Sequence, residues 1–297
     1  MSATVLALVS GLGFGSAAIF ARVGMQGVSP LASTFISVSV SFLPAFVLAL
    51  AFAFSDIKDL PPIAIPLFLA LGAINFLGGR TLSYQAIGRI GAARASAILG
   101  TAAVFASVFA ITLTGERPHV VVLLGTLVIV GGLIAALGKT ISDGGSTGKT
   151  AIIGYLAALG AAACYGGTNV FAKELTEEYG SPLMISAISL FFGIVLLWPI
   201  TGKEAVRSVR QSRHDLRFVL FAGLSGLAAA TGVICLYYAL QRAEVSVISP
   251  IVSANPLVTL LLAQLFLSRL EELTRSLFLG IAVVIFGVVL VVLGSTL

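Results

Sequence analysis

Four polar side chains lie inside long apolar stretches of the sequence, where each of them needs a polar partner. Arg80 comes one helical turn before Tyr84, and Asn75, Asn169 and Asn255 lie within apolar segments. Charged and amide groups are costly against lipid, so such residues turn toward other protein groups or a water-filled space. Arg80 either reaches the membrane surface with its long side chain or faces a wet cavity, where its guanidinium attracts a carboxylate.

Aromatic and hydroxyl side chains in the same segments can complete a binding site around Arg80. Tyrosine offers both a ring face and a hydroxyl group, which suit a ligand with an apolar or aromatic part. The candidate binding residues are Phe14, Asn75, Arg80, Tyr84, Thr101, Tyr165, Asn169, Tyr237, Tyr238, Ser249 and Asn255. This set favours aromatic or other neutral amino acids over sugars as the ligand.

Two prolines, Pro250 and Pro256, lie in the segment that carries Asn255. Pro256 removes one helical hydrogen bond and frees a carbonyl near Val252. In lipid such a break is tolerated only where other groups satisfy the freed backbone. We therefore expect either an opened, gating segment beside a polar cavity or a simple packing kink. The small-residue segment 92–114, its counterpart in the first half, is expected to be an unbroken helix.

The elements that must position these residues are membrane-spanning helices. Hydrophobic residues make up 58% of the chain and charged residues 10%, whereas soluble domains average about 45–50% and about 25%. A span needs about 20 apolar residues, so ten spans leave no room for a separate soluble domain. The expected spans are 3–22, 30–54, 61–87, 92–114, 118–138, 151–173, 180–201, 216–240, 245–268 and 276–295.

The chain divides into two similar halves, residues 1–138 and 151–297, joined by a polar linker at 139–150. Phe20-Ala21-Arg22 matches Phe171-Ala172-Lys173, and residues 84, 89, 96 and 110 match residues 237, 242, 249 and 263 at one constant offset. Five spans is an odd number, so the second half enters the membrane inverted. The predicted fold is all-α, with ten transmembrane helices as two inverted five-helix repeats around a central cavity, an arrangement typical of transporters.

The sequence resembles the drug/metabolite transporter superfamily, of the EamA type. The residues that carry the resemblance are Phe14-Gly15 with Phe20-Ala21-Arg22 in span 1, Tyr84-Gln85-Ala86 in span 3 and Gly115-Glu116-Arg117 after span 4. The resemblance implies export of amino acids or related metabolites through a central cavity lined by spans 1, 3, 4, 6, 8 and 9.

Chemistry that the sequence lacks narrows the function further. All twelve acidic residues and both histidines fall in loops or at span ends, so we expect no coupling through a buried carboxylate, and facilitated diffusion or exchange instead. No paired acids, Ser-His dyad or ligand cluster lies at membrane depth, so we expect no enzyme activity and no metal. The linker sequence DGGSTGKT has Asp143 where a phosphate-binding loop needs glycine, and we expect no cofactor.

The basic residues mark the membrane topology and give no sign of nucleic-acid binding. Loops after odd-numbered spans hold eleven of them, and loops after even-numbered spans hold four. The positive-inside rule then places both termini outside the cytoplasm, whereas the family resemblance implies both inside. Residues 202–217 are expected to form a surface helix at the lipid headgroups. We expect a multi-pass protein of the cell membrane, in bacteria the inner membrane.

The predicted function is that of a secondary carrier that binds a small molecule and works by alternating access. Exporters of drugs, nucleobases or sugars remain alternatives, as does a channel or membrane scaffold; an intramembrane enzyme ranks last. A monomer is expected. The glycine faces of spans 5 and 10 are expected to pack inside the protein. Alternatively they form the contact of a dimer; the glycines are Gly125, Gly132, Gly280 and Gly287.

Overall fold

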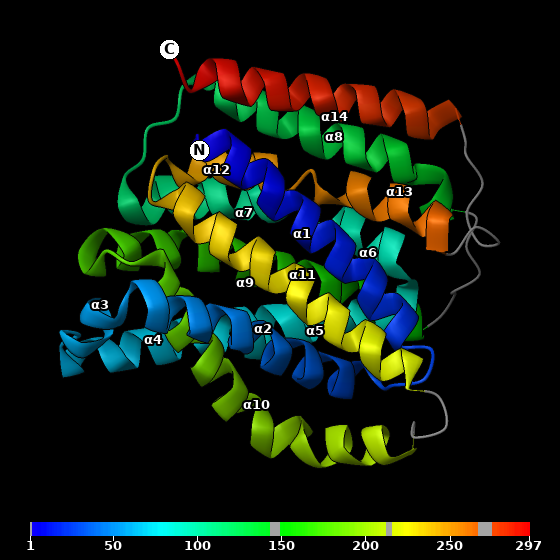
Figure 1. Cartoon of the computed structure of the whole chain (residues 1–297). Coiled ribbons are helices and arrows are strands. Elements are labelled where there is room, and N and C mark those ends of the chain that lie inside the picture. Colours follow the sequence, from blue (N-terminus) through cyan, green and yellow to red (C-terminus); the bar gives the residue numbers. More distant parts are fainter. Residues whose placement is uncertain (1, 143–148, 212–215, 267–274) are drawn as a thin grey trace.

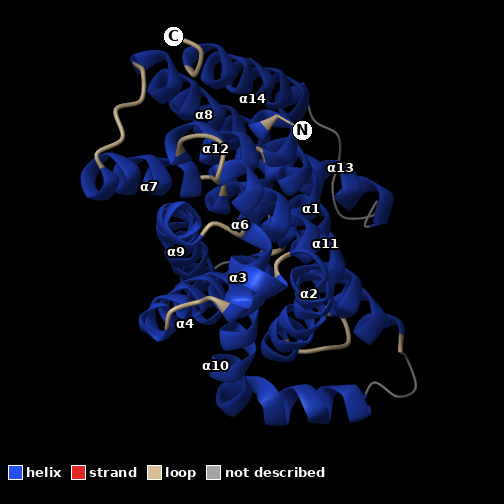
Figure 2. Cartoon of the chain, turned by 60° about the vertical axis from the view of Figure 1, so that its left-hand side comes forward, coloured by secondary structure: helices blue, strands red, loops and turns tan. Residues whose placement is uncertain are grey.

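The computed structural model describes residues 2–142, 149–211, 216–266 and 275–297, and these form helices and no strand (Figures 1 and 2). The first half contains α1 (Ala3–Gly24), α2 (Pro30–Phe52), α3 (Phe54–Lys58), the 3-10 turn η1 (Pro62–Ala64), α4 (Ile65–Gly72), the π-helix η2 (Ala73–Arg80), α5 (Thr81–Ile90), α6 (Ala92–Leu99), α7 (Ala102–Phe109), the π-helix η3 (Ala110–Thr114) and α8 (Val120–Ser142). The second half contains α9 (Lys149–Tyr179), α10 (Pro182–Gln211), α11 (Arg217–Leu240), α12 (Val245–Val252), α13 (Asn255–Phe266) and α14 (Arg275–Gly294).

The helices follow the expected membrane spans. Within the described residues, eight helical segments are long and apolar enough to cross a membrane, and two shorter apolar segments, Val120–Ala135 and Ala282–Gly294, lie in α8 and α14. Large apolar side chains such as Leu124, Leu127 and Phe286 are more than half exposed on these two helices. Such faces need lipid as their solvent. The all-α, multi-pass membrane fold is confirmed.

Helix packing repeats between the halves. α1 packs along α11, and its counterpart α9 packs along η2 and α5. α6 and α7 pack on α9, just as α12 and α13 pack on α1. α8 and α14, which end the two repeats, lie side by side and run in opposite directions (Figure 1). Two similar five-span units in opposite orientations account for this pattern.

Glycines make the contact between α8 and α14 close. A Cβ on Gly125 would lie 2.9 Å from the Gly287 carbonyl oxygen, and a Cβ on Gly287 would lie 3.0 Å from the Gly125 oxygen. Gly132 faces the backbone of Val284 equally closely. These glycines are therefore used for packing inside the chain, as small residues are between membrane helices.

The repeated Phe-Ala-Arg and Phe-Ala-Lys sequences place a cation at equivalent helix ends. Arg22 donates from Nη1 to the Ile87 carbonyl, at 3.1 Å, and to the Gly88 carbonyl, at the end of α5. Lys173 donates from Nζ to the Ala243 carbonyl, at 3.3 Å, just beyond the end of α11. A positive charge stabilises the carbonyl end of a helix. The motif therefore ties the first span of each repeat to the third.

The prediction that span 4 is unbroken is wrong. Helix α6 ends at Leu99 and α7 begins at Ala102, so Gly100 and Thr101 interrupt the span. The register that aligns Tyr84 with Tyr237 puts this interruption opposite Ser253–Ala254, between α12 and α13. Both spans therefore break at the same place, one of them without proline.

Residues 202–211 are helical, as expected from the sequence, and Arg207 and Arg210 are exposed. They continue α10, which contains Pro199 and bends away from its neighbours (Figure 1). Ala205 is buried with Val28 and Ala32, and Ser29 donates a hydrogen bond to Glu204. These contacts dock the extension onto the start of α2 while its arginines stay exposed. Residues 212–215, the next part of the expected surface helix, lie outside the described residues.

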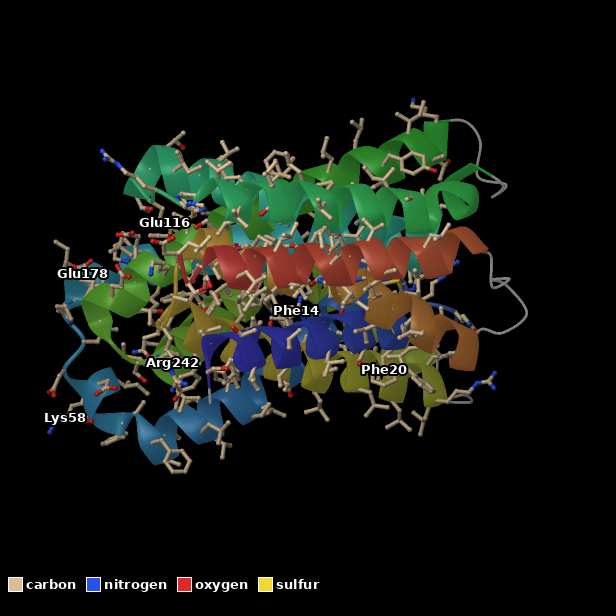
Figure 3. The ribbon with its side chains drawn as sticks, turned by 90° about the horizontal axis from the view of Figure 1, so that it is seen from above. Phe14, Phe20, Lys58, Glu116, Glu178 and Arg242 are labelled. Carbon is tan, nitrogen blue, oxygen red and sulfur yellow. The ribbon has the colours of Figure 1, made fainter. Side chains whose placement is uncertain are left out.

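Both termini lie at one end of the molecule (Figure 1). Lys58, Glu116, Glu178 and Arg242 gather at this end, whereas Phe14 lies near the middle (Figure 3). By sequence, the loops at this termini end carry four basic and seven acidic residues, and the loops at the opposite end are strongly basic. The two ends of the bundle therefore differ in sign of charge.

Candidate functional site

A cavity lies between the halves, walled by the first, third and fourth spans of each repeat. About 850 Å³ of space in and around it, including open solvent at its mouth, is free of protein atoms. Its lining residues are Phe14, Ala17, Ala18, Asn75, Arg80, Ser83, Tyr84, Ile87, Ser96, Leu99, Ala102, Tyr165, Thr168, Asn169, Ala229, Val233, Leu236, Val252, Ser253 and Asn255.

The structure brings seven of the eleven candidate residues to this cavity. They are Phe14, Asn75, Arg80, Tyr84, Tyr165, Asn169 and Asn255. The other four lie outside the lining. Thr101 donates to the Ile98 carbonyl of its own span, and Tyr238 lies under the Arg242 guanidinium. Tyr237 and Ser249 are buried one layer behind the lining.

Tyr237 and Ser249 act on the cavity through two of the asparagines. Asn75 donates from Nδ2 to the Tyr237 hydroxyl at 3.2 Å, and Asn169 donates from Nδ2 to the Ser249 hydroxyl at 2.8 Å. Both bonds are buried, so they fix the amide planes of the two lining residues. One N–H of each amide is thereby used, and the rest of each amide group remains for the cavity.

Arg80 is the buried cation of the site. Its side chain is only 4% exposed, and its guanidinium lies 5.6 Å from the centre of the Phe76 ring. Nη1 donates to the Ser37 hydroxyl at 3.1 Å. Within the described residues no carboxylate pairs with Arg80. An arginine at the centre of a membrane helix costs about 3 kcal/mol on insertion scales, so this guanidinium is expected to face water or an anion.

The Ser37 hydroxyl starts a chain of hydrogen bonds whose direction is fixed. Ser225 donates to the Ala17 carbonyl at 2.9 Å. Each hydroxyl has one hydrogen, so Tyr84 donates to Ser225 at 2.6 Å and Ser37 donates to Tyr84 at 2.8 Å. Ser37 is thus left as an acceptor for Arg80. The chain crosses from α5 to α2, α11 and α1 and holds the guanidinium in place.

The π-helix η2 sets the positions of Asn75 and Arg80. Residues five apart point about 140° away from each other in an α-helix, but nearly the same way where the hydrogen bonds run from i to i+5. Thr81 donates its hydroxyl hydrogen to the Phe76 carbonyl, five residues earlier, at 3.0 Å. The wider turn therefore turns both polar side chains to the cavity.

Glycines in the facing helices admit the two aromatic rings of the site. A Cβ on Gly79 would lie 2.7 Å from the Tyr165 ring, and a Cβ on Gly232 would lie 2.9 Å from the Phe14 ring. Gly78, the neighbour of Gly79, faces the Cys164 side chain in the same way. Gly78 and Gly79 therefore let side chains of α9 approach η2 closely.

The freed backbone expected in span 9 is already satisfied. Asn255 donates from Nδ2 to the Val252 carbonyl at 3.0 Å, so a side chain satisfies this backbone group, as a break within the membrane requires. Pro250 lies inside α12, and Pro256 is the second residue of α13, where a proline needs no hydrogen bond. The break between them, at Ser253, does line the cavity.

Sequence reasoning missed the small lining residues, and four of the residues it missed are polar: Ser83, Ser96, Thr168 and Ser253. Thr168 has a buried hydroxyl without a hydrogen-bond partner and lines the cavity. The repeat register pairs it with Ala17, just as it pairs Asn169 with Ala18. The register of the two repeats was the signal that could have found these positions.

Metal ligands do not gather in the part of the chain that the structure describes. No three histidine, cysteine, aspartate or glutamate side chains there come close enough to hold an ion. The polar groups of the cavity are amides, hydroxyls and one guanidinium, a set suited to hydrogen bonding an organic ligand.

Comparison with known proteins agrees with the two-repeat architecture. The EamA-like transporter family matches residues 1–138 and again residues 152–293. An uncharacterized protein of Methanocaldococcus jannaschii is 31% identical over 126 residues, which cover 42% of this chain and 86% of the relative. A crystal structure of another protein superposes with a TM-score of 0.73, over 99% of this chain and 96% of the other, at 16% identity. That likeness shows the fold alone. Because the family matches both halves, the chain belongs to the EamA-like transporter family, whose members are membrane transporters of small solutes.

Proposed function

We propose that the chain is a secondary carrier that exports amino acids, chiefly aromatic or other neutral ones. The observation that carries the proposal is Arg80, a buried guanidinium beside a central cavity with no carboxylate partner among the described residues. A guanidinium holds a carboxylate through two parallel hydrogen bonds. Phe14 and Tyr165 supply ring surface for the rest of the substrate.

Transport would proceed by alternating access, with the two repeats rocking about the bound substrate. Glu116, at the end of span 4, accepts hydrogen bonds from the Val245 N–H at 2.8 Å and from the Ser246 N–H at 3.0 Å. The Ser246 hydroxyl donates to the same carboxylate at 2.7 Å. This Glu116 contact joins the two repeats at the termini end, so opening that end would require it to break.

The proposed driving force is exchange or facilitated diffusion. The described residues that line the cavity offer amides, hydroxyls, apolar groups and one arginine, and include no acidic residue or histidine. Proton-coupled carriers keep a titratable group of that kind within the membrane. A substrate gradient, rather than a proton taken up at the site, would then drive transport.

An efflux screen combined with proteoliposomes tests the proposal. Cells that overexpress the chain are expected to export one or more neutral amino acids, and the purified protein should move them with saturable, stereoselective kinetics. A counter-gradient of unlabelled substrate should accelerate uptake if the mechanism is exchange. Single-channel currents without saturation of transport would indicate that the protein is a channel and would overturn the proposal of a carrier. Export of drugs, nucleobases or sugars alone would support the carrier mechanism and would overturn amino acids as its substrates.

We further propose that the chain sits in the cell membrane, in bacteria the inner membrane, with both termini outside the cytoplasm. The excess of basic residues at the opposite end supports this orientation. Membrane-impermeant labelling of a cysteine introduced at Ser295, in a variant with Cys164 and Cys235 replaced, tests it. Labelling in intact cells is expected, and labelling only after lysis would reverse the orientation.

A further inference from the structure

Equivalent positions of α1 and α9 line the cavity with different chemistry. The register that aligns Phe20 with Phe171 pairs Phe14 with Tyr165, Ala17 with Thr168 and Ala18 with Asn169. All six residues line the cavity. In each pair the member on α9 carries a hydroxyl or amide group, and the member on α1 carries none.

The third spans of the two repeats differ in the same sense. Arg80 of η2 is equivalent to Val233 of α11, and Ser83 of α5 is equivalent to Leu236. These four residues also line the cavity. η2 and α5 pack on α9, whereas α11 packs on α1. The cavity therefore has a polar wall, formed by η2, α5 and α9, and an apolar wall, formed by α1 and α11.

The polar wall contains donors that the protein itself leaves unused. The guanidinium of Arg80 has five N–H groups, and its one side-chain acceptor in the described structure is the Ser37 hydroxyl. Thr168, 2% exposed, has a hydroxyl without any partner. Donors of this kind call for an acceptor, and a carboxylate is the strongest acceptor that a metabolite offers a guanidinium.

The net charge of the lining distinguishes between possible substrates. Among the described residues that line the cavity, Arg80 is the single charged one, and none is acidic. A ligand with one negative charge would neutralise the site. A zwitterion would bring an ammonium group that finds no carboxylate there and would leave the site as positive as before. The cost of a charge within the membrane is relieved only in the first case.

We propose that the cavity selects amphiphilic monoanions, with the carboxylate on the polar wall at Arg80 and the apolar tail along the apolar wall, over zwitterions of the same shape. The inference rests on the proposed function, because it takes the same cavity as the transport site. It extends the proposed substrates from neutral amino acids to carboxylates of similar shape that carry no free ammonium group, and it ranks these carboxylates as the tighter ligands.

Three ligands with the same phenyl tail test the charge preference. They are 3-phenylpropionate, which is an anion, phenylalanine, which is a zwitterion, and 2-phenylethylamine, which is a cation. Binding to the purified full chain in detergent is measured by calorimetry at neutral pH. We expect 3-phenylpropionate to bind about tenfold tighter than phenylalanine, and the amine to bind weakest. Equal or tighter binding of phenylalanine overturns the proposal, and so does the failure of all three to bind.

Variants of the two walls assign the preference to its residues. Arg80→Gln is expected to abolish the preference for the anion, whereas Arg80→Lys keeps the charge and should keep most of it. Arg207→Gln, at an exposed position of α10, is the matched control and should bind like the unaltered chain. Val233→Gln should weaken all phenyl ligands alike, because it alters the apolar wall. A preference that survives Arg80→Gln would contradict the proposal even if one of the other variants fails to fold.

The transport assays keep this inference separate from the proposed function. Saturable export of phenylalanine without a preference for 3-phenylpropionate would support the carrier and overturn selection of monoanions. Preferential binding of 3-phenylpropionate with no transport in proteoliposomes would support the selection and overturn the carrier.

Discussion

α1 and α9 carry the same Phe-Ala-cation motif in their C-terminal parts and hold equivalent places in their repeats, yet they offer the cavity different side chains. Their shared features are those that position a helix: a glycine opposite each aromatic ring and a cation at the end of the third span. At the lining they differ in polarity, because Tyr165, Thr168 and Asn169 of α9 stand where α1 has Phe14, Ala17 and Ala18. The comparison indicates that the repeated residues determine how the helices pack, and that residues which differ between the halves determine what the cavity offers a ligand.

Moving the charge between the walls gives the largest expected effect. Arg80→Val is expected to reduce transport of a carboxylate-bearing substrate by about a hundredfold, because the charged partner of the substrate is lost. Combining it with Val233→Arg restores the net charge on the apolar wall. We expect no recovery, since Val233 lacks the Ser37–Tyr84–Ser225 chain that holds Arg80. Initial uptake rates in proteoliposomes measure both.

Recovery of transport in the double variant would show that net charge alone matters and that the two walls are interchangeable. Size-exclusion profiles of the purified variants check that each one folds before the rates are compared.

Closeness of packing also differs between the two equivalent helix pairs. A Cβ on Gly13 of α1 would lie 2.7 Å from the Ala228 carbonyl oxygen of α11, whereas a Cβ on Gly78 of η2 meets the Cys164 sulfur at 3.0 Å. Backbone cannot move aside as a side chain can. Gly13→Ala is therefore expected to destabilise the protein by about 2 kcal/mol, and Gly78→Ala by clearly less.

Thermal unfolding in detergent measures the two glycine variants. Gly131→Ala is the control, because nothing lies within 4 Å of a Cβ there and alanine favours a helix by about 1 kcal/mol over glycine. An equal loss of stability for Gly13→Ala and Gly78→Ala would mean that both helix pairs are equally rigid.

The Glu116 contact allows closure of the cavity at the termini end to be tested. Glu116→Ala leaves two backbone N–H groups of α12 without their acceptor, and we expect it to lower the free energy of unfolding by about 1 to 2 kcal/mol. Because the contact joins the repeats at the termini end, labelling of a cysteine placed at Val247 should also become faster. Glu174→Ala, exposed on α9, is the control. Slower labelling than in the control would contradict a role of the contact in closing this end.

The fold and the wider outline of the site were accessible from the sequence. Apolar segments of about twenty residues leave little choice but membrane helices, and the repeated motifs indicated two inverted halves. Arg80 and the asparagines were found because a polar group within an apolar span has few alternatives to a cavity. Phe14 and Tyr165, also candidates from the sequence, line the same cavity.

Features that depend on packing could not be derived in this way. Tyr237 and Ser249 have the same residue types as true lining residues, and only their bonds to Asn75 and Asn169 place them in the second layer. The π-helix has no sequence signature beyond Gly78 and Gly79, and Gly100–Thr101 resembles any other small-residue stretch. Proline suggested a break in span 9 alone, although the architecture of the repeat breaks both spans.

The smallest expected effect concerns the helix breaks in spans 4 and 9. It tests whether proline or the architecture of the repeat causes the break in span 9. If the repeat architecture interrupts both spans, then Pro256 adapts to a break that exists without it, as in span 4. Pro256→Ala should then retain normal expression and transport within about twofold of the unaltered chain, since a proline in the first turn of a helix gives up no hydrogen bond there. Asn255→Leu, the neighbouring variant, should impair transport more, because it removes the donor to the Val252 carbonyl. A large loss of transport in Pro256→Ala at normal expression would make proline the cause of the break, and the two halves would then differ in their frame as well as in their lining.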